Sequence, residues 1–234
     1  MKKRILIITL TVIIFSIFLL GFIKIIGAKT NLKTINPSWG LGTSVTEAVS
    51  NNRDYDWYVD QYNTGESSAV NCGPTSIEMA MKWKNKDSSI TAEEIRNKYL
   101  LQDDNGMELS QIASCLKENN INIRFLYDVT EEKLKNELTA GNIIIVGMDM
   151  GYISYNIINE ERVGKFFDGD SFHYITIKGY KVVDDKLYFE TYDPFSLNHR
   201  YMDGTPIGKD RYYLAKELVK ATVFYSDWMV VVDK

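Results

Sequence analysis

The stretch Asn71-Cys72-Gly73-Pro74-Thr75-Ser76 places a cysteine at the predicted start of a helix. Proline suits the first turn of a helix, where its missing N–H costs no hydrogen bond, and Ile77, Ala80 and Met81 follow at helical spacing. The positive end of a helix dipole favours the thiolate, which is the reactive form of a thiol. The stretch therefore indicates that Cys72 is a nucleophile, although an arbitrary unpaired cysteine is more often a small apolar core residue.

A nucleophilic thiol needs a general base, and the chain offers two histidines as candidates. His173 lies near the start of the alternating apolar and polar stretch 172–178, which is typical of a half-buried strand. His199 lies in the polar stretch 196–200, which has no such period. His173 is therefore the better candidate for the base, on the strand face that it shares with Ile175 and Ile177.

A second strand, predicted over 187–193, places a carboxylate on the face of its apolar residues. Asp193 shares this face with Leu187 and Phe189. Such a carboxylate can accept a hydrogen bond from one nitrogen of His173 and so leave the other nitrogen for the thiol. The alternative is that Asp193 before Pro194 only ends the strand and opens a turn.

The connection between these two strands decides whether the histidine and the carboxylate meet. A two-residue turn at Asp184-Asp185 would leave the two apolar faces out of phase by one residue, which burial forbids. An odd-length connection or a bulge near Gly179 restores the phase. We then expect Ile177 to pair with Phe189, which brings Asp193 directly opposite His173.

A donor for the oxyanion that forms when a thiolate attacks a carbonyl is the fourth part of such a site. Gln61 lies eleven positions before Cys72, in the aromatic and polar stretch 57–62. Its side-chain amide is our candidate, together with the backbone N–H of Cys72. A glutamine in such a stretch is otherwise an ordinary solvated side chain.

The order Gln61, Cys72-Gly73-Pro74, His173-Tyr174, Asp193-Pro194 resembles the papain-like cysteine peptidases, and most closely their C39-like branch. The resemblance covers about residues 54–234. It implies an α+β fold in which a helical half packs on an antiparallel β half, with the active site in the cleft between them. It also implies Gln61 as oxyanion donor, Cys72 as nucleophile, His173 as base and Asp193 as its orienting group. Phe172 departs from the family, where a glycine is frequent before the histidine.

The rest of the chain fits this α+β expectation. Helices are predicted from Thr91 to Leu100, Met107 to Lys117 and Thr130 to Leu138, followed by a buried strand over 142–148. A polar loop follows up to Asp170, and the loops Tyr152 to Phe167 and Ser196 to Tyr213 are expected to determine the specificity of the cleft. Cys115 falls within the second helix as a packing residue, so a disulfide with Cys72 is not expected.

Composition excludes several function classes. The net charge is −4, and no basic stripe interleaved with aromatic residues indicates a nucleic-acid partner. The sequence has no His-Glu-x-x-His, paired Cys-x-x-Cys or glycine-rich phosphate loop, so no metal and no cofactor are expected.

The N-terminal residues are typical of a membrane-targeting segment. Met1-Lys2-Lys3-Arg4 precedes a largely apolar run from Ile5 to Ile23, which as a helix would span about 30 Å. We expect residues 1–28 to be an anchor or a signal segment, with the uncleaved anchor favoured because the run exceeds a signal-peptide core and lacks a good cleavage site. The basic flank would stay in the cytoplasm and the remainder would lie outside, or be secreted if the segment is cleaved.

Two further boundaries follow. Residues 29–53 are interpreted as a linker, which either holds the body off the membrane or packs on it, and residues 54–234 as one catalytic domain. The prediction is thus a membrane-tethered, extracytoplasmic cysteine peptidase acting on a peptide or protein. The alternatives are an acyltransferase, deamidase or cell-wall amidase with the same triad, or a non-catalytic binding module on this fold.

Overall fold

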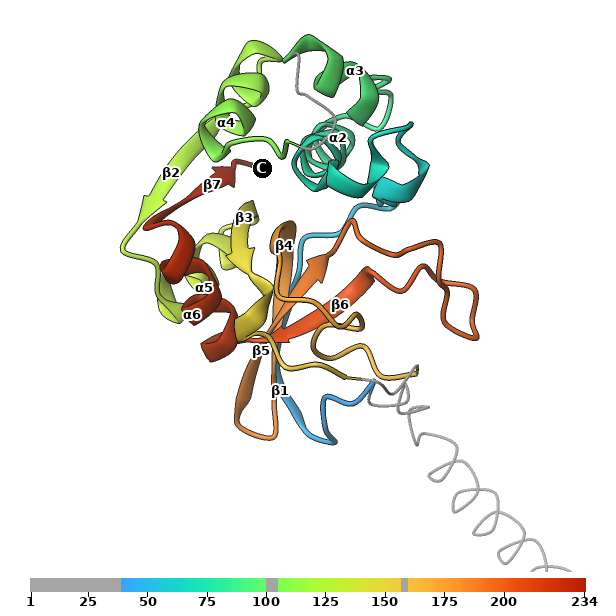
Figure 1. Ribbon diagram of the computed structural model, residues 1–234. Coiled ribbons are helices and arrows are strands. Elements are labelled where there is room, and N and C mark those ends of the chain that lie inside the picture. Colours follow the sequence, from blue (N-terminus) through green and yellow to red (C-terminus); the bar gives the residue numbers. More distant parts are fainter. Residues whose placement is uncertain (1–38, 100–104, 157–159) are drawn as a thin grey trace, which may run out of the picture. The chain divides into compact units, whose positions relative to one another are not determined.

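A seven-stranded antiparallel sheet forms the centre of the protein (Figure 1). The computed structural model describes residues 39–99, 105–156 and 160–234. The strand order is β2-β7-β3-β4-β5-β6, and β1 also pairs with β4. The strands are β1 (Val45–Ser50), β2 (Ile123–Tyr127), β3 (Ile143–Asp149), β4 (Phe172–Val183), β5 (Lys186–Tyr192), β6 (Lys209–Leu214) and β7 (Trp228–Val232).

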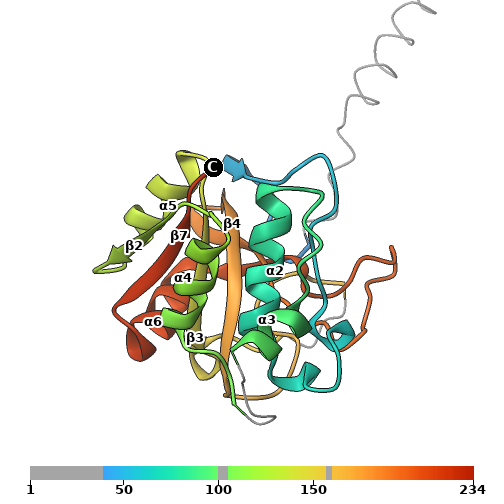
Figure 2. The same ribbon diagram turned by 90° about the horizontal axis from the view of Figure 1, so that it is seen from above.

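Helices cover both faces of this sheet, as the two ribbon views show (Figure 1, Figure 2). One face carries α2 (Cys72–Lys84), α3 (Ala92–Lys98) and α4 (Leu109–Glu118), and the other carries α5 (Glu131–Thr139) and α6 (Ala215–Tyr225). Short 3-10 turns are η1 (Gln61–Asn63), η2 (Ser68–Val70) and η3 (Met150–Tyr152).

The side chains of β3 explain why the sheet needs two helical layers. Ile143 and Ile145 pack with the core under α2 and α4, whereas Ile144 and Val146 pack with the core under α5 and α6. Successive side chains on a strand point to opposite faces, so an unbroken apolar run requires cover on both sides. The predicted α+β arrangement, with helices near Cys72 and strands near His173, is confirmed, and α5 and α6 add a second helical layer.

The predicted helices begin where their capping residues indicate. Thr91 forms a capping box with Glu94 at the start of α3, and the Thr130 side chain accepts a hydrogen bond from the Lys133 N–H at the start of α5. Such side chains satisfy N–H groups that have no partner inside the helix. The three predicted helices of this region are confirmed to within two residues at their observed ends.

The connection between β4 and β5 combines a tight turn with a bulge. Asp184 and Asp185 have positive φ values of 47° and 60° and form the two-residue turn. The register then shifts between Ile177 and Gly179, so Lys178 is the extra residue. The predicted bulge near Gly179 is confirmed, and it keeps the apolar faces of the two strands in phase.

The predicted register of these strands is wrong. Phe189 pairs with Tyr180, and Ile177 pairs with Thr191, because the turn is tight and the phase is corrected only at the bulge. Thr176 pairs with Tyr192, so Asp193 lies diagonally from His173 on the same face instead of directly opposite it. Diagonal neighbours on one face remain within reach of side chains.

Part of the predicted linker 29–53 belongs to the sheet. Residues Val45–Ser50 form β1, which pairs with the second half of β4, and the compact unit extends from Trp39 to Lys234. Of the two alternatives for this segment, packing on the body therefore holds for these residues, because backbone pairing keeps them on the sheet. The predicted membrane segment 5–23 lies outside the described residues, and within the described residues no helix has the length and apolarity to cross a membrane.

The loop expected from Ser196 to Tyr213 is also shorter than predicted. Its last part, from Lys209, is β6, which pairs with β5. The pairing brings Tyr213 opposite Phe189, on the sheet face that carries the candidate histidine.

Candidate active site

Cys72 is the first residue of α2, with Asn71 as N-cap. Its thiol is unpaired and half-buried. Gly73 follows because a side chain there has no room: a Cβ would lie 2.9 Å from the Cβ of Met107 and 3.4 Å from the Tyr174 ring. The sequence Cys-Gly-Pro thus allows the helix to start against β4 with the thiol at its positive end.

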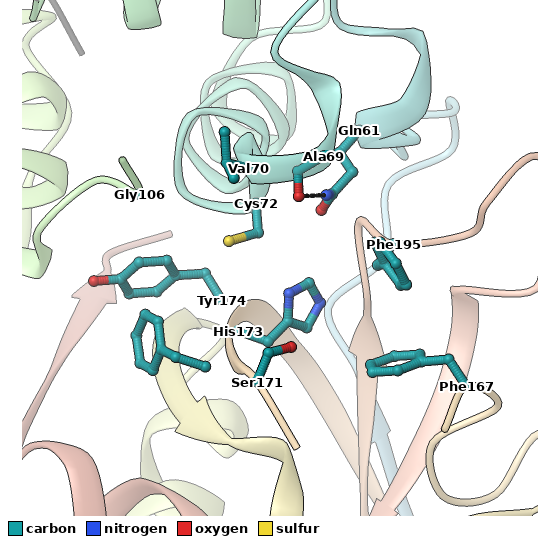
Figure 3. A pocket seen from close by; sticks show the side chains of 11 residues that line it. Gln61, Ala69, Val70, Cys72, Gly106, Phe167, Ser171, His173, Tyr174 and Phe195 are labelled. Carbon is teal, nitrogen blue, oxygen red and sulfur yellow. Dashed lines mark hydrogen bonds between the residues drawn. The ribbon is translucent and has the colours of Figure 1, made fainter. Parts of the chain in front are cut away.

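His173 lies near the start of β4 and pairs with Met148 of β3. Its ring is buried, and Figure 3 shows it beside Cys72, the first residue of α2. Nε2 of His173 is 2.7 Å from Oδ1 of Asp193. This contact leaves Nδ1 as the ring nitrogen available to the thiol.

Asp193 follows the last residue of β5 and is fully buried. Besides His173, its carboxylate accepts hydrogen bonds from the Phe195 N–H at Oδ1, 2.9 Å, and from the Tyr213 hydroxyl at Oδ2, 2.6 Å. Its backbone is held as well, because Asp193 N donates to Gly208 O and the Tyr58 hydroxyl donates to Asp193 O. These bonds fix both the main chain and the carboxylate.

Charge interactions in this row of side chains oppose the cost of burial. Burial would raise the pKa of the Cys72 thiol, but the hydrogen bond and charge of His173 outweigh it and lower the pKa. Burial would lower the pKa of His173, but the charge and hydrogen bond of Asp193, together with the thiol, raise it to about 10. Burial would raise the pKa of Asp193, but His173 and then Tyr213 and the Phe195 N–H lower it. Each of the three charged forms is therefore stabilised by its neighbours in this row.

Gln61, the candidate oxyanion donor, lines the same cavity as Cys72 and His173. Its side chain is buried, and Nε2 donates to the carbonyl of Ser68, 3.0 Å, and to that of Ala69, 3.3 Å; Figure 3 shows the bond to Ala69. These bonds orient the amide, and they also occupy the donors that an oxyanion would use. One of them, such as the longer bond to Ala69, must weaken before an N–H can point at a substrate.

The cavity beside Cys72 has a volume of about 310 Å³. Its lining is largely apolar, and no Asp, Glu, Lys or Arg is among the described residues that line it. Phe167 and Phe195 form one wall, with ring centroids 4.9 Å apart, and both stack edge-on to the His173 ring. This wall restrains the imidazole through edge contacts with the two phenyl rings.

The second histidine and the second cysteine lie elsewhere. His199 belongs to the loop between β5 and β6 and lines a different surface pocket with Tyr201 and Met202. Cys115 is an unpaired, buried residue of α4 that packs in the core, as predicted. No group of three or more potential metal ligands occurs among the described residues.

The structure also adds partners of Asp193 that sequence reasoning missed. Tyr213, Tyr58 and the Phe195 N–H all bond to it, although they come from β6, the segment before η1 and the turn after β5. The sequence Asp193-Pro194 is typical of a turn, in which an Asp side chain often accepts a hydrogen bond from the N–H two residues later. Neither tyrosine carried such a signal, because each is one of fifteen in the chain.

Comparison with known proteins decides the family. The model of the Peptidase_C39 like family matches residues 54–217. The chain belongs to this family. It is therefore a cysteine peptidase, and its fold is papain-like, as predicted from the sequence.

Two solved structures illustrate how far the likeness extends. A candidate C39-like peptidase from Bacillus anthracis is 14% identical, with a TM-score of 0.53 over 80% of this chain and 98% of that one. UfSP from C. elegans is 15% identical, with a TM-score of 0.51 over 85% of this chain and 35% of that one. At these identities the matches establish the fold alone. No curated protein matches the chain.

Proposed function

We propose that this C39-like chain hydrolyses peptide bonds with Cys72 as nucleophile, His173 as general base and acid, and Asp193 as the group that orients His173. The observation that supports it most is that the Cys72 thiol at the start of α2 and the His173 ring lie side by side in one cavity (Figure 3), with Nε2 of that ring 2.7 Å from the fully buried carboxylate of Asp193. A cysteine with a hydrogen-bonded base, itself oriented by a third group, is the arrangement of an activated nucleophile.

The proposed reaction is acyl transfer through a thioester. The Cys72 thiolate attacks the carbonyl carbon, and the tetrahedral intermediate collapses as the His173 imidazolium gives its proton to the leaving amine. A water molecule then attacks the thioester while His173 accepts its proton. The carboxylic acid product leaves and the thiolate and imidazolium are restored.

The oxyanion of each tetrahedral intermediate requires hydrogen-bond donors. The N–H of Cys72 is suited to this role because the first N–H groups of a helix have no carbonyl partner within it. We assign Gln61 as the second donor, because its amide lies in the same cavity. The amide would turn one N–H from the Ala69 carbonyl toward the substrate.

Peptidase activity is tested by incubating the purified protein with a mixed peptide library and identifying the products by mass spectrometry. Cys72→Ala should abolish cleavage, whereas Cys115→Ala, which removes the other thiol from the core, should retain it. Cleavage that survives Cys72→Ala would contradict the proposal. Hydrolysis products, rather than transfer products or deamidated peptides, separate a peptidase from the other acyl-transfer chemistries.

We also propose that residues 5–23 tether the catalytic domain to the outer face of a membrane. The support is the length of the apolar run and the basic residues that precede it. We expect the full chain to sediment with membranes. We also expect protease added outside intact cells to digest the catalytic domain. Recovery of the full chain in the soluble fraction would contradict the tether.

A further inference from the structure

Tyr213 is a fully buried residue of β6 whose hydroxyl lies against the candidate triad. Its Oη donates to Oδ2 of Asp193 over 2.6 Å. Its ring packs in the core beneath α5 and α6, in the same cluster as Ile175 and Ile177 of β4. A phenylalanine would fill this space equally, so packing alone does not account for the hydroxyl.

The hydrogen bonds of Asp193 divide between its two carboxylate oxygens. Oδ1 accepts from His173 Nε2 and from the Phe195 N–H. Oδ2 accepts from Tyr213, which is its donor in the part of the chain that the structure describes. A buried carboxylate oxygen without a donor is costly, and bonds to a charged acceptor are stronger than those between neutral groups.

The backbone contacts of Asp193 do not fix its carboxylate. Gly208 O and the Tyr58 hydroxyl hold the N–H and the carbonyl, but the side chain can still rotate about its own bonds. The Tyr213 hydroxyl acts at the end of the side chain, on the oxygen opposite the one that faces His173. Among the described residues, this hydrogen bond is the one that holds the outer oxygen and its negative charge, while His173 and the Phe195 N–H hold Oδ1.

We propose that Tyr213 is a positioning residue: it holds the Asp193 carboxylate so that Oδ1 stays aligned with His173 Nε2 and the imidazolium that activates Cys72 is retained. The inference rests on the proposed function, because it assumes that His173 and Asp193 support a reactive thiolate. Tyr213 of β6 would then be the fourth side chain of the row that Cys72, His173 and Asp193 form.

The test is the rate of Cys72 alkylation by iodoacetamide in the full chain, followed by peptide mass spectrometry at pH 6 and at pH 9.5. In Tyr213→Phe the carboxylate loses its anchor, so the imidazolium is stabilised less and a smaller fraction of Cys72 is thiolate at pH 6. We expect the rate at pH 6 to fall about threefold to tenfold, equivalent to roughly half to one pKa unit of the thiol. The rate at pH 9.5, where an ordinary thiol ionises, should change much less.

Tyr212→Phe is the matched control. Tyr212 is the adjacent buried tyrosine of β6 and packs in a different core cluster, with Leu41, Val183 and Tyr188. It should leave the rate at pH 6 unchanged. An equal fall in both variants would indicate a general effect of the β6 tyrosines and would overturn the proposal.

A double-mutant cycle shows whether Tyr213 acts through the carboxylate. Asp193→Asn should lower the rate at pH 6, and Tyr213→Phe should then have no further effect. Full additivity of the two changes, or no effect of Tyr213→Phe alone, would overturn this inference and leave the proposed function standing. An unchanged rate in Asp193→Asn would overturn both.

Discussion

Burial disfavours the charged forms of Cys72, His173 and Asp193, and interactions among the three side chains favour these forms. The pKa of His173 is raised to about 10, so its contribution to stability is complete below its unfolded value of about 6.5 and is lost as the pH rises through about 10. The pKa values of Cys72 and Asp193 are lowered, so their contributions are lost as the pH falls through their folded values. The reactive form of the site therefore belongs to the pH range between these limits.

Gln61 allows turnover to be separated from thiol reactivity. Its amide is expected to stabilise the oxyanion but not the thiolate, so Gln61→Ala should lower kcat by about 10²-fold to 10³-fold. The rate of Cys72 alkylation should stay within about twofold of that of the unaltered protein, because no change in thiol pKa is expected. Peptide hydrolysis and alkylation, measured on the same preparation, check both expectations.

The control for this substitution is Thr64→Val. Thr64 holds the same 3-10 turn through its bond to the Gln61 carbonyl, but it offers no donor to the cavity. It should disturb turnover less than Gln61→Ala does. An equal loss in both variants would show that the shape of the turn, and not the amide, carries the effect.

At this scale the sequence predicts the residues with a local signature and misses those without one. Cys72 could be chosen as the candidate nucleophile because it stands at a predicted helix start. His173 could be chosen as the candidate base because the chain has two histidines and this one lies in a predicted strand. Tyr213 reaches Asp193 only through the pairing of β5 with β6, which no spacing along the chain reveals.

The β4–β5 pair is the element on which the site depends. Its bulge adds Lys178, whose buried amine lies 2.7 Å from Glu190 and 2.8 Å from Asp210. Without the extra residue, either His173 or Asp193 would face the other side of the sheet. The need for a bulge near Gly179 was predictable from the apolar phases of the strands. The predicted register failed because a two-residue turn and one bulge pair Ile177 with Thr191, whereas a pairing with Phe189 would need a longer connection.

Gly179 tests this element. A Cβ at this position would collide with Val49 O of β1 and would lie 2.8 Å from Glu190 Oε2, so backbone would have to move. Gly179→Ala should lower the free energy of unfolding by about 1–3 kcal/mol, as overpacking in a rigid site does. Urea unfolding followed by tryptophan fluorescence measures this change.

Gly106→Ala serves as the comparison for Gly179→Ala. A Cβ at Gly106 meets no atom within 4 Å among the described residues, so the free energy of unfolding should change by less than about 0.5 kcal/mol. Equal stability of Gly179→Ala and the unaltered protein would mean that the approach of β1 to β4 is not a constraint on the bulge.

The folded domain of the whole molecule includes residues that precede the family match. The match starts at residue 54, yet β1 pairs with β4. In addition, the Asn51 side chain donates to the carbonyl of Asn142, just before β3, and the Arg53 side chain donates to the carbonyl of Trp83 in α2. The sequence does not show β1 because its side chains are mostly exposed, so no apolar alternation marks it. The helices and the buried β3 strand, in contrast, are predictable from periodicity and capping.

Two truncated chains test this boundary. Residues 39–234 should unfold cooperatively with the stability of the longer chain, whereas residues 54–234 should be less stable because they leave the edge of β4 unpaired. Urea unfolding of both chains gives the comparison. Equal midpoints would show that β1 contributes nothing to the stability of the domain.

The most direct test of the central claim is the pH dependence of Cys72 alkylation by iodoacetamide in the unaltered protein and in His173→Ala. The row of half-buried thiol, buried imidazole and buried carboxylate predicts rapid alkylation at pH 6, well below the usual thiol pKa of about 8.5, and loss of this reactivity in His173→Ala. Alkylation of the unaltered protein that rises only near pH 8.5, with the same profile in His173→Ala, would contradict the account.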